Sequence, residues 1–168
     1  MPVRQPLPHL WLLSDARNDA VLERALRRLP RGSGFVFRHY HLQPEERRAR
    51  FARLLRLARA RGHTVLLAGS AAEARHWGAD GSYGPSGTLA TAHNLRELAR
   101  ANRCQAAAVL LSPAFPTRSH PGAPTLGPLR FRLLAARSTK PVVALGGMTP
   151  ATARRLGWPR WAAIDGLS

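Results

Sequence analysis

The C-terminal half of the chain contains Leu111-Ser112-Pro113-Ala114-Phe115-Pro116-Thr117-Arg118-Ser119-His120 and, further on, Pro141-Val142-Val143-Ala144-Leu145-Gly146-Gly147-Met148. Each stretch is an apolar run that ends abruptly in small, turn-forming residues. Parallel strands that are buried on both faces show this continuous apolar pattern. In α/β barrels such strands lead into loops at the rim. The two stretches therefore predict late parallel strands that deliver their loops to one rim of a barrel.

The alternation of strands and helices extends along the whole chain. Short apolar runs predict strands at residues 10–13, 35–38 and 64–67, an extended piece after the turn 78–81, and strands at 88–92, 106–111, 142–145 and 161–164. Apolar residues at helical spacing, with Pro, Asn and Gly at the ends, predict helices over 21–29, 44–61, 71–77, 94–101 and 129–136 and after Thr149. This order predicts an α/β protein with a (β/α)8 TIM barrel, and an open α/β sheet is the alternative.

The expected barrel is a shortened one. The chain has 168 residues, which indicates a single domain over 1–168, whereas this fold usually needs ~250 residues. Only a few residues around Gly84-Pro85-Ser86-Gly87 separate the fourth and fifth strands, although a parallel crossover normally needs about a dozen or more. We therefore expect one internal helix and the final helix to be missing. Apolar surface exposed at these two places would favour a homo-oligomer.

Composition limits the partners and the compartment. The formal net charge is +17, and Lys140 is the only lysine. Because the arginines are spread along predicted helices, as in residues 47–61, the sequence favours solvated helix faces over nucleic-acid binding, and a positive field helps to capture phosphorylated small molecules. Cys104 is the only cysteine, and no apolar run approaches the ~18 residues of a membrane span. The sequence therefore predicts a cytoplasmic protein without a membrane partner.

The motif set resembles the thiamine phosphate synthase family and its TenI-like relatives. The resemblance rests on the turn 78–81 (Gly-Ala-Asp-Gly), the strand end Thr91-Ala92-His93, the segment 112–117 and the strand end 141–147. It implies coupling of a pyrimidine diphosphate with a thiazole phosphate, which gives thiamine phosphate and pyrophosphate. The family uses magnesium to neutralise the leaving diphosphate, because cations fixed at developing charge lower the barrier.

The resemblance carries over unevenly to the diphosphate and magnesium residues. Arg38 matches a diphosphate-binding arginine of the family, and His120 stands where the family usually has a lysine. These two residues are the catalytic candidates. Residues 68–70 (Ala-Gly-Ser) replace the Asn-Asp-Arg that supplies a magnesium ligand, and residues 82–84 (Ser-Tyr-Gly) offer no second aspartate. Magnesium is thus implied by the family, while its usual protein ligands are absent.

The thiazole-phosphate half of the family site is better preserved. The resemblance assigns substrate contacts to strand ends and to the loop after the sixth strand, namely Thr91, His93, Pro113, Thr117 and Ser119. Barrels often bind phosphate between the loops that follow the seventh and eighth strands, and glycine lets backbone amides approach closely. Phosphate contacts are therefore expected at Gly146, Gly147, Gly166 and Leu167.

Two functions follow from this pattern. The first is a thiamine phosphate synthase-like enzyme of thiamine biosynthesis. The alternative is a degenerate TenI-like barrel that binds a phosphorylated thiazole or thiamine phosphate without turnover. TenI-like isomerisation uses a histidine at the position of Pro113, so that route is not expected. The sequence leaves open whether catalysis survives, and nucleic-acid binding is a third hypothesis that rests on charge alone.

Overall fold

The structure is a computed structural model that describes residues 6–167. Its strands are β1 (Leu10–Leu13), β2 (Gly34–Phe37), β3 (Thr64–Ala68), β4 (Gly81–Gly84), β5 (Leu89–Ala92), β6 (Ala108–Leu111), β7 (Val142–Ala144) and β8 (Trp161–Ala163). Its helices are the 3-10 helix η1 (Ala16–Val21) and the α-helices α1 (Leu22–Arg28), α2 (Pro44–Ala60), α3 (Ala71–Trp77), α4 (Leu95–Arg103), α5 (Gly127–Ala135) and α6 (Pro150–Leu156).

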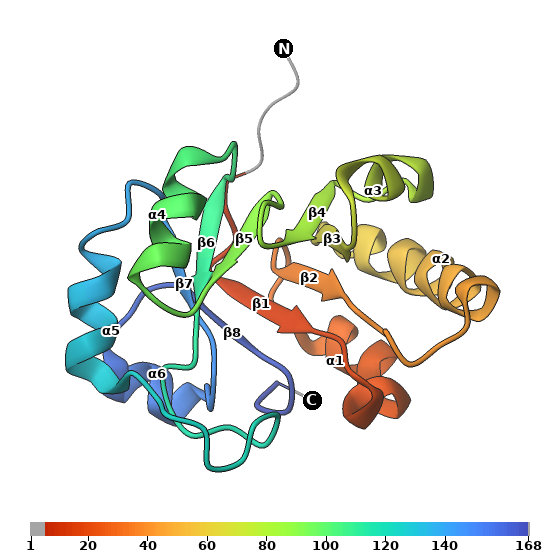
Figure 1. Cartoon of the computed structure of the whole chain (residues 1–168). Helices are drawn as coiled ribbons and strands as arrows, with labels where there is room; N and C mark the ends of the chain where they lie inside the picture. The colour runs from red at the N-terminus through yellow and green to blue at the C-terminus, as the bar shows by residue number, and fades with distance from the viewer. Residues whose placement is uncertain (1–5, 168) are drawn as a thin grey trace.

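The strands form a closed parallel barrel in the order β1-β2-β3-β4-β5-β6-β7-β8 (Figure 1). Pairing of β8 with β1 completes the ring, with Leu10 opposite Trp161 and Leu12 opposite Ala163. The predicted shortened (β/α)8 barrel is therefore confirmed. The alternative of an open sheet is wrong, because an open sheet would leave two edge strands unpaired.

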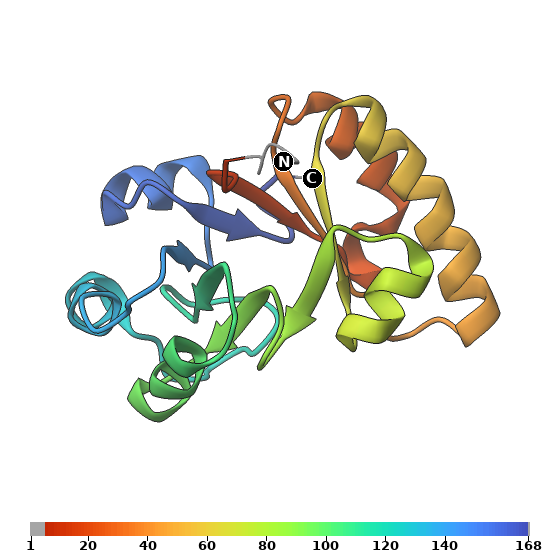
Figure 2. The same cartoon turned by 90° about the horizontal axis from the view of Figure 1, so that it is seen from above.

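Side chains alternate between the inside of the barrel and the surrounding helices, as the pleat of a strand requires. Trp11, Leu13, Val36 and other alternate strand residues form the cluster inside the barrel. The strand residues between them pack outward. One outer cluster joins β1–β3 to α1–α3, and the other joins β5–β8 to α4–α6. Figure 2 shows these two groups of helices on opposite sides of the barrel.

The barrel lacks a helix between β4 and β5, as predicted. Tyr83 is aligned with Leu89 and Gly84 with Ala90, so β5 begins level with the end of β4. The connecting turn returns the chain only to the level of Tyr83, the residue before the end of β4, rather than to the start of that strand. This offset explains how so short a crossover can join parallel strands. Within the described residues no helix follows β8.

The ends of the helices are fixed by side-chain caps. Asn94 accepts a hydrogen bond from the amide of Glu97 at the start of α4, as expected, and Thr149 caps α6 in the same way. At the first helix, Asp15 caps η1, and the side chain of Asn18 accepts from the amide of Asp15. No helix in the described part of the chain is long and apolar enough to span a bilayer.

The large exposed apolar side chains do not lie at the two places where a helix is missing, between β4 and β5 and after β8. Leu95 on α4 and Leu129 and Leu133 on α5 are exposed, and so is Tyr40 after β2. The helix-free turn between β4 and β5 carries none of them. A homo-oligomer therefore stays a prediction.

Candidate functional site

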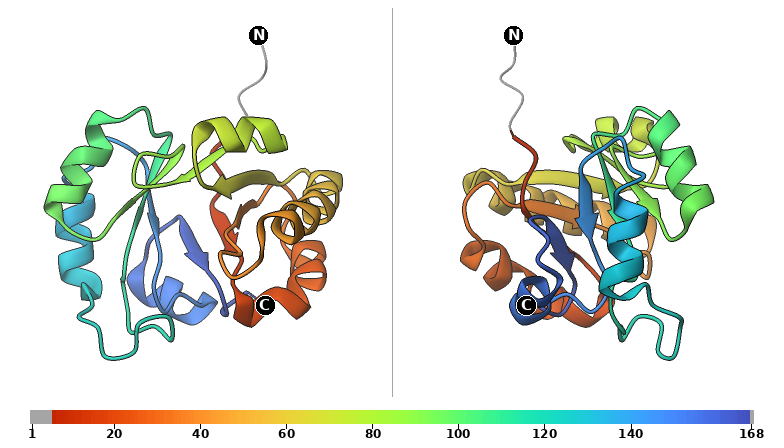
Figure 3. Two further views of the ribbon diagram at one scale, coloured as in Figure 1. Left: turned by 45° about the vertical axis from the view of Figure 1, so that its right-hand side comes forward. Right: turned by 90° about the vertical axis from the view of Figure 1, so that its left-hand side faces the viewer.

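A cavity of about 840 Å³ opens at the end of the barrel where the strands terminate. Loops that follow β2, β4, β5, β6, β7 and β8 contribute to its wall. The longest of them connects β6 to α5 and extends beyond the barrel at one end (Figure 3). Gly146 after β7 and Gly166 after β8 line the same cavity. The two glycine-bearing tips therefore lie together at one mouth, as the sequence predicted.

The structure gathers all but one of the predicted site residues in this cavity. Those that line it are Arg38, Thr91, His93, Pro113, Thr117, Ser119, His120, Gly146, Gly147 and Gly166. Leu167 does not line it, because its side chain packs against the two outer clusters of the barrel. The placement concerns position only, and the roles of these residues stay predictions.

The loop after β7 combines tight packing with unused amide donors. Gly146 and Gly147 have φ angles of 101° and 59°, and a Cβ at either position would collide with the β6–α5 loop, at Pro113 and at the Pro116 carbonyl. The amides of Ala114 and Phe115 donate to the oxygens of Leu145 and Gly146 over 2.8 and 3.0 Å. Glycine is thus needed first for loop packing. Within residues 6–167, however, the amides of Gly146 and Gly147 donate to no acceptor, so this wall can still donate to an anion.

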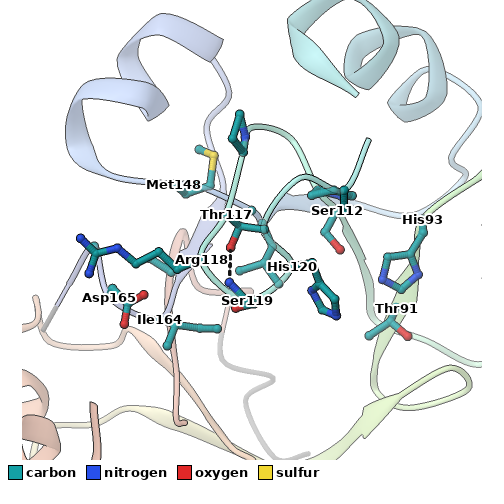
Figure 4. A pocket seen from close by; sticks show the side chains of 18 of the residues that line it. Thr91, His93, Ser112, Thr117, Arg118, Ser119, His120, Met148, Ile164 and Asp165 are labelled. Carbon is teal, nitrogen blue, oxygen red and sulfur yellow. Dashed lines mark hydrogen bonds between the residues drawn. The ribbon is translucent and has the colours of Figure 1, made fainter. Parts of the chain in front are cut away.

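The β6–α5 loop brings hydroxyl, imidazole and guanidinium groups to the cavity (Figure 4). Ser112 is buried at its start, and the Ser112–Pro113 peptide bond is cis. The amide of Ser119 donates to Oγ1 of Thr117 over 3.3 Å. Arg118 and His120 are exposed on the same loop and line the cavity. The loop therefore offers a guanidinium and an imidazole beside hydroxyl groups.

Arg17 on η1 connects this loop to the loop after β8. Its Nη2 donates to Oγ of Ser119 over 2.8 Å, and its Nη1 lies 3.4 Å from Oδ2 of Asp165. Asp165 is a carboxylate in the cavity wall, where it would repel a bound phosphate. The ion pair with Arg17 compensates that charge. Sequence reasoning missed Arg17, because it lies 102 residues before Ser119 and carries no motif.

Arg38 is held by protein groups at the cavity wall. Its Nε donates to the Ser14 carbonyl over 2.8 Å, and its Nη2 lies 2.9 Å from Oδ2 of Asp15. Burial opposes ionisation of Asp15, but hydrogen bonds from Arg17 and the charges of Arg17 and Arg38 lower the pKa of that carboxyl. Burial also raises the pKa of the nearby Tyr83 phenol, so Tyr83 lines the cavity as a neutral group. Nε and Nη2 of Arg38 thus already donate hydrogen bonds to Ser14 and Asp15.

A buried polar chain lies behind Arg38. The Arg38 amide donates to Oγ of Ser14 over 2.8 Å, and Nδ1 of His39 lies 2.7 Å from the same oxygen. Nε2 of His39 lies 2.7 Å from Oδ1 of Asp19. Burial lowers the pKa of His39 despite the opposing effect of Asp19, so the neutral imidazole is favoured. Sequence reasoning missed this chain, since its members belong to different elements.

His93 is oriented by the first turn of α4. Its Nδ1 lies 2.8 Å from Oε2 of Glu97, and its amide donates to the same oxygen over 2.9 Å. These hydrogen bonds lower the pKa of Glu97. Because Nδ1 is occupied, Nε2 is the ring nitrogen available to a ligand. Figure 4 shows His93 next to Thr91 on the side of the cavity away from Asp165.

Arg47 fills the rim beside the ends of β2 and β3. Its guanidinium donates to the backbone oxygens of Arg38 and Ala68 over 2.9 and 2.6 Å, and lies 3.3 Å from Glu73. The expectation that the arginines of this helix form a solvated face is therefore wrong for Arg47, and also for Arg50, which pairs with Asp19 and Glu23. Both side chains are largely buried.

The residues present do not fit a resident magnesium ion. Among the described residues, no three of the His, Cys, Asp and Glu side chains gather as a ligand set. Oxygen ligands from carboxylates are what magnesium requires, and Asp165, the carboxylate in the cavity wall, is paired with Arg17. We therefore derive no step through a metal ion.

Fold and cavity together define a (β/α)8 barrel with a cavity at the carboxyl ends of its strands. The family model for thiamine monophosphate synthase matches residues 89–162, which run from β5 into β8. Comparison with curated proteins gave no match. The resemblance that the sequence predicted is thus confirmed over the part of the chain that carries the loops after β5, β6 and β7.

Solved structures agree on the fold. Thiamine phosphate pyrophosphorylase from Pyrococcus furiosus is similar with a TM-score of 0.76 and 22% sequence identity, over 93% of this chain and 85% of that one. Citrate synthase SbnG is similar with a TM-score of 0.60 and 10% identity, over 95% and 87%. At these identities the likenesses show the barrel fold.

Proposed function

We propose that the protein binds a phosphorylated thiazole, or thiamine phosphate, in the cavity at the mouth of the barrel. The observation that carries the proposal is the pair of unused amide donors at Gly146 and Gly147, within a wall that also bears Arg118 and His120. Backbone amides and cations that converge on one cavity favour an anionic group. The thiamine monophosphate synthase match over residues 89–162 supports a ligand of this class.

The ring of the ligand has apolar wall to pack against. Pro113, Met148 and Ile164 line the cavity together with its polar groups. Sites of this volume bind small molecules mainly through apolar walls, with a few polar groups that fix orientation. Thr91 and His93 lie across the cavity from Asp165 (Figure 4), and we propose that they contact the end of the ligand away from the phosphate.

Coupling of the thiazole phosphate with a pyrimidine diphosphate is the activity that the family resemblance implies. Arg38 is the cation that we propose for the leaving diphosphate, because it matches a diphosphate-binding arginine of the family and lines the cavity. Its bonds to Ser14 and Asp15 reduce what it can offer. Binding without turnover is therefore the second form of the same proposal.

Calorimetry tests the binding. We expect thiazole phosphate to bind at least tenfold more tightly than the unphosphorylated thiazole alcohol. Arg118→Gln should lower the affinity for thiazole phosphate and leave the affinity for the alcohol unchanged. Arg96→Gln is the matched control, since Arg96 is exposed on α4 and does not line the cavity. Equal affinity for the two thiazoles, or no binding of either, would refute the proposal.

A pyrophosphate-release assay then separates its two forms. The protein is given both substrates and magnesium at high protein concentration. If the wild type releases pyrophosphate and Arg38→Gln does not, the result supports the synthase. Binding of thiazole phosphate with no pyrophosphate released supports the barrel that binds without turnover.

A further inference from the structure

The fold concentrates positive charge on the end of the barrel opposite the cavity. In a (β/α)8 barrel each helix runs back along its strand, so helix C-termini and the loops into the next strand surround the amino ends of the strands. The sequence places basic residues in the last turn of each α-helix. Charges that are spread along the sequence are thereby brought to one end of the molecule.

One half of this end is formed by α1, α2, α3 and the loops after them. Arg27 and Arg28 end α1, and Arg31 follows in the loop. Arg59 is in the last turn of α2, Arg61 is the C-cap of that helix, and Arg75 is in the last turn of α3. The two loops lie together, because the amide of Gly32 donates to the oxygen of Arg61 over 3.4 Å.

The other half is formed by α4, the loop after α5 and the loop before β8. Arg100 and Arg103 lie in the last turn of α4 and are exposed. Arg137 and Lys140 lie between α5 and β7, and Arg160 immediately precedes β8. Asn102 donates to the oxygen of Arg137 over 2.9 Å, which joins the end of α4 to the loop after α5. We call these eleven residues of the two halves the basic face.

Negative charge is almost absent from the basic face. Asp80, in the loop between α3 and β4, is the single acidic residue there, and it lies 3.7 Å from Arg59. The other acidic residues of the chain follow β1 and β8 or lie in α1 and the first turns of α2, α3 and α4. Asp15, Asp19, Glu23 and Asp165 among them are paired with arginines of that other end. The basic face thus carries eleven cations against one carboxylate.

Helix dipoles do not account for the whole charge. A cation in the last turn of a helix is favoured by the dipole, but Arg31, Arg137, Lys140 and Arg160 lie in loops. The cations gathered at this end of the barrel repel one another, and a bound anion would offset that repulsion.

The chemistry of the basic face favours a phosphate backbone as its partner. Its cations are nearly all arginines, which bind phosphate with two parallel hydrogen bonds. The large exposed apolar residues of the described chain, Tyr40, Leu95, Leu129 and Leu133, all lie outside it. Among the described residues it therefore offers no large, fully exposed aromatic or apolar side chain for stacking on bases or for insertion into a bilayer.

From these observations we infer that the basic face binds nucleic acid through its phosphodiester backbone, without sequence preference and independently of the cavity. The sequence argued against nucleic acid because the arginines are spread along helices. The barrel removes that objection by bringing the helix ends together. Both DNA and RNA present this backbone, and the experiment distinguishes them.

Fluorescence anisotropy with a labelled double-stranded DNA and a labelled single-stranded RNA of arbitrary sequence tests the inference, at 50, 100 and 200 mM KCl. The affinity should fall steeply with salt and should not depend on sequence. The variant R27Q/R28Q/R100Q/R103Q should bind at least tenfold more weakly than the wild type, and its log–log salt slope should be shallower by about 3. The nucleic acid that binds with the lower Kd at the same salt concentration is the preferred one.

The matched control is R24Q/R48Q/R96Q/R130Q, which removes the same charge at exposed arginines outside the basic face and the cavity. It should bind within threefold of the wild type. Equal losses in the two variants would mean attraction by net charge and would overturn the inference, as would no binding at 50 mM KCl. Tighter binding to phosphatidylserine vesicles, lost in the first variant, would also overturn it in favour of a membrane. Both variants should bind thiazole phosphate like the wild type, so this result is separate from the test of the cavity.

Discussion

Nη2 of Arg47 donates a hydrogen bond to the backbone oxygen of Ala68 over 2.6 Å. This bond ties the long helix α2 to the carboxyl end of β3. The guanidinium also lies 5.2 Å from the centre of the Trp77 ring, and its side chain is only 12% exposed. Arg47 therefore fills the rim of the barrel beside residues 68–70, where the family resemblance leads one to expect a magnesium ligand and a phosphate-binding cation.

Replacement of Arg47 should therefore destabilise the protein. Arg47→Ala removes hydrogen bonds to Arg38, Ala68 and Glu73 and leaves two carbonyl oxygens without that donor. Charged hydrogen bonds contribute about 1.5–3 kcal/mol each, and they are not additive, so we expect a loss of about 3 kcal/mol in the free energy of unfolding. Urea denaturation followed by circular dichroism measures it. Arg48→Ala, at an exposed position one residue further, should change stability by less than about 0.5 kcal/mol.

The elements of the fold were accessible from the sequence because they depend on local patterns. Continuous apolar runs gave the bounds of β1 correctly and those of the other predicted strands within two residues. The gathering of the predicted site residues in one cavity followed from the rule that barrel strands end at one face. The placement of Leu167 was not foreseen, because the packing of one side chain after β8 is decided by its neighbours in space.

Contacts between distant polar groups could not be predicted in the same way. Arg17 meets Ser119 and Asp165 across the mouth, and Arg47 is buried although its helix looks solvated in sequence. Neither arginine has a spacing that distinguishes it from the others on the surface. Their roles depend on which carbonyls and carboxylates the closed barrel places within reach.

Inside the barrel, Gly34 makes room for Trp11. A Cβ at position 34 would overlap the indole ring, which is 1% exposed and donates its Nε1 to the Pro8 oxygen over 3.0 Å. Overpacking of a core typically costs about 1–3 kcal/mol, so Gly34→Ala should lower the free energy of unfolding by that amount. The double variant Gly34→Ala/Trp11→Leu should recover part of the loss, as urea denaturation would show. Additive effects of the two substitutions would contradict this contact.

Stability should fall as the pH drops from 7.5 to 5.5. Burial lowers the pKa of His39 and of His63 below 6.5, so the unfolded chain takes up protons in this range that the native protein does not. The unfolded state is then favoured as pH falls through about 6.5, and stability is complete above it. Urea midpoints across the range measure the slope. His63→Gln keeps a donor for the Leu26 oxygen and should flatten the slope, and an unchanged slope in that variant would contradict the assignment.

Arg17 should protect phosphate binding from the charge of Asp165. The Asp165 carboxylate lies 3.4 Å from Nη1 of Arg17. Asp165 is on the loop after β8, and it lines the same cavity as Gly146 and Gly147. In Arg17→Gln the carboxylate is left uncompensated, and we expect the affinity for thiazole phosphate to fall about tenfold, which corresponds to about 1.4 kcal/mol.

The double variant Arg17→Gln/Asp165→Asn distinguishes this effect from a loss of loop structure. If charge is the cause, removal of the carboxylate restores binding to within about threefold of the wild type, because no repulsion remains. If Arg17 acts instead by fixing Ser119 through the 2.8 Å hydrogen bond, the double variant binds as weakly as Arg17→Gln. Ser119→Ala then reproduces the loss by itself. Isothermal titration calorimetry of the four proteins, at two salt concentrations, decides between these outcomes, since only the electrostatic effect is screened by salt.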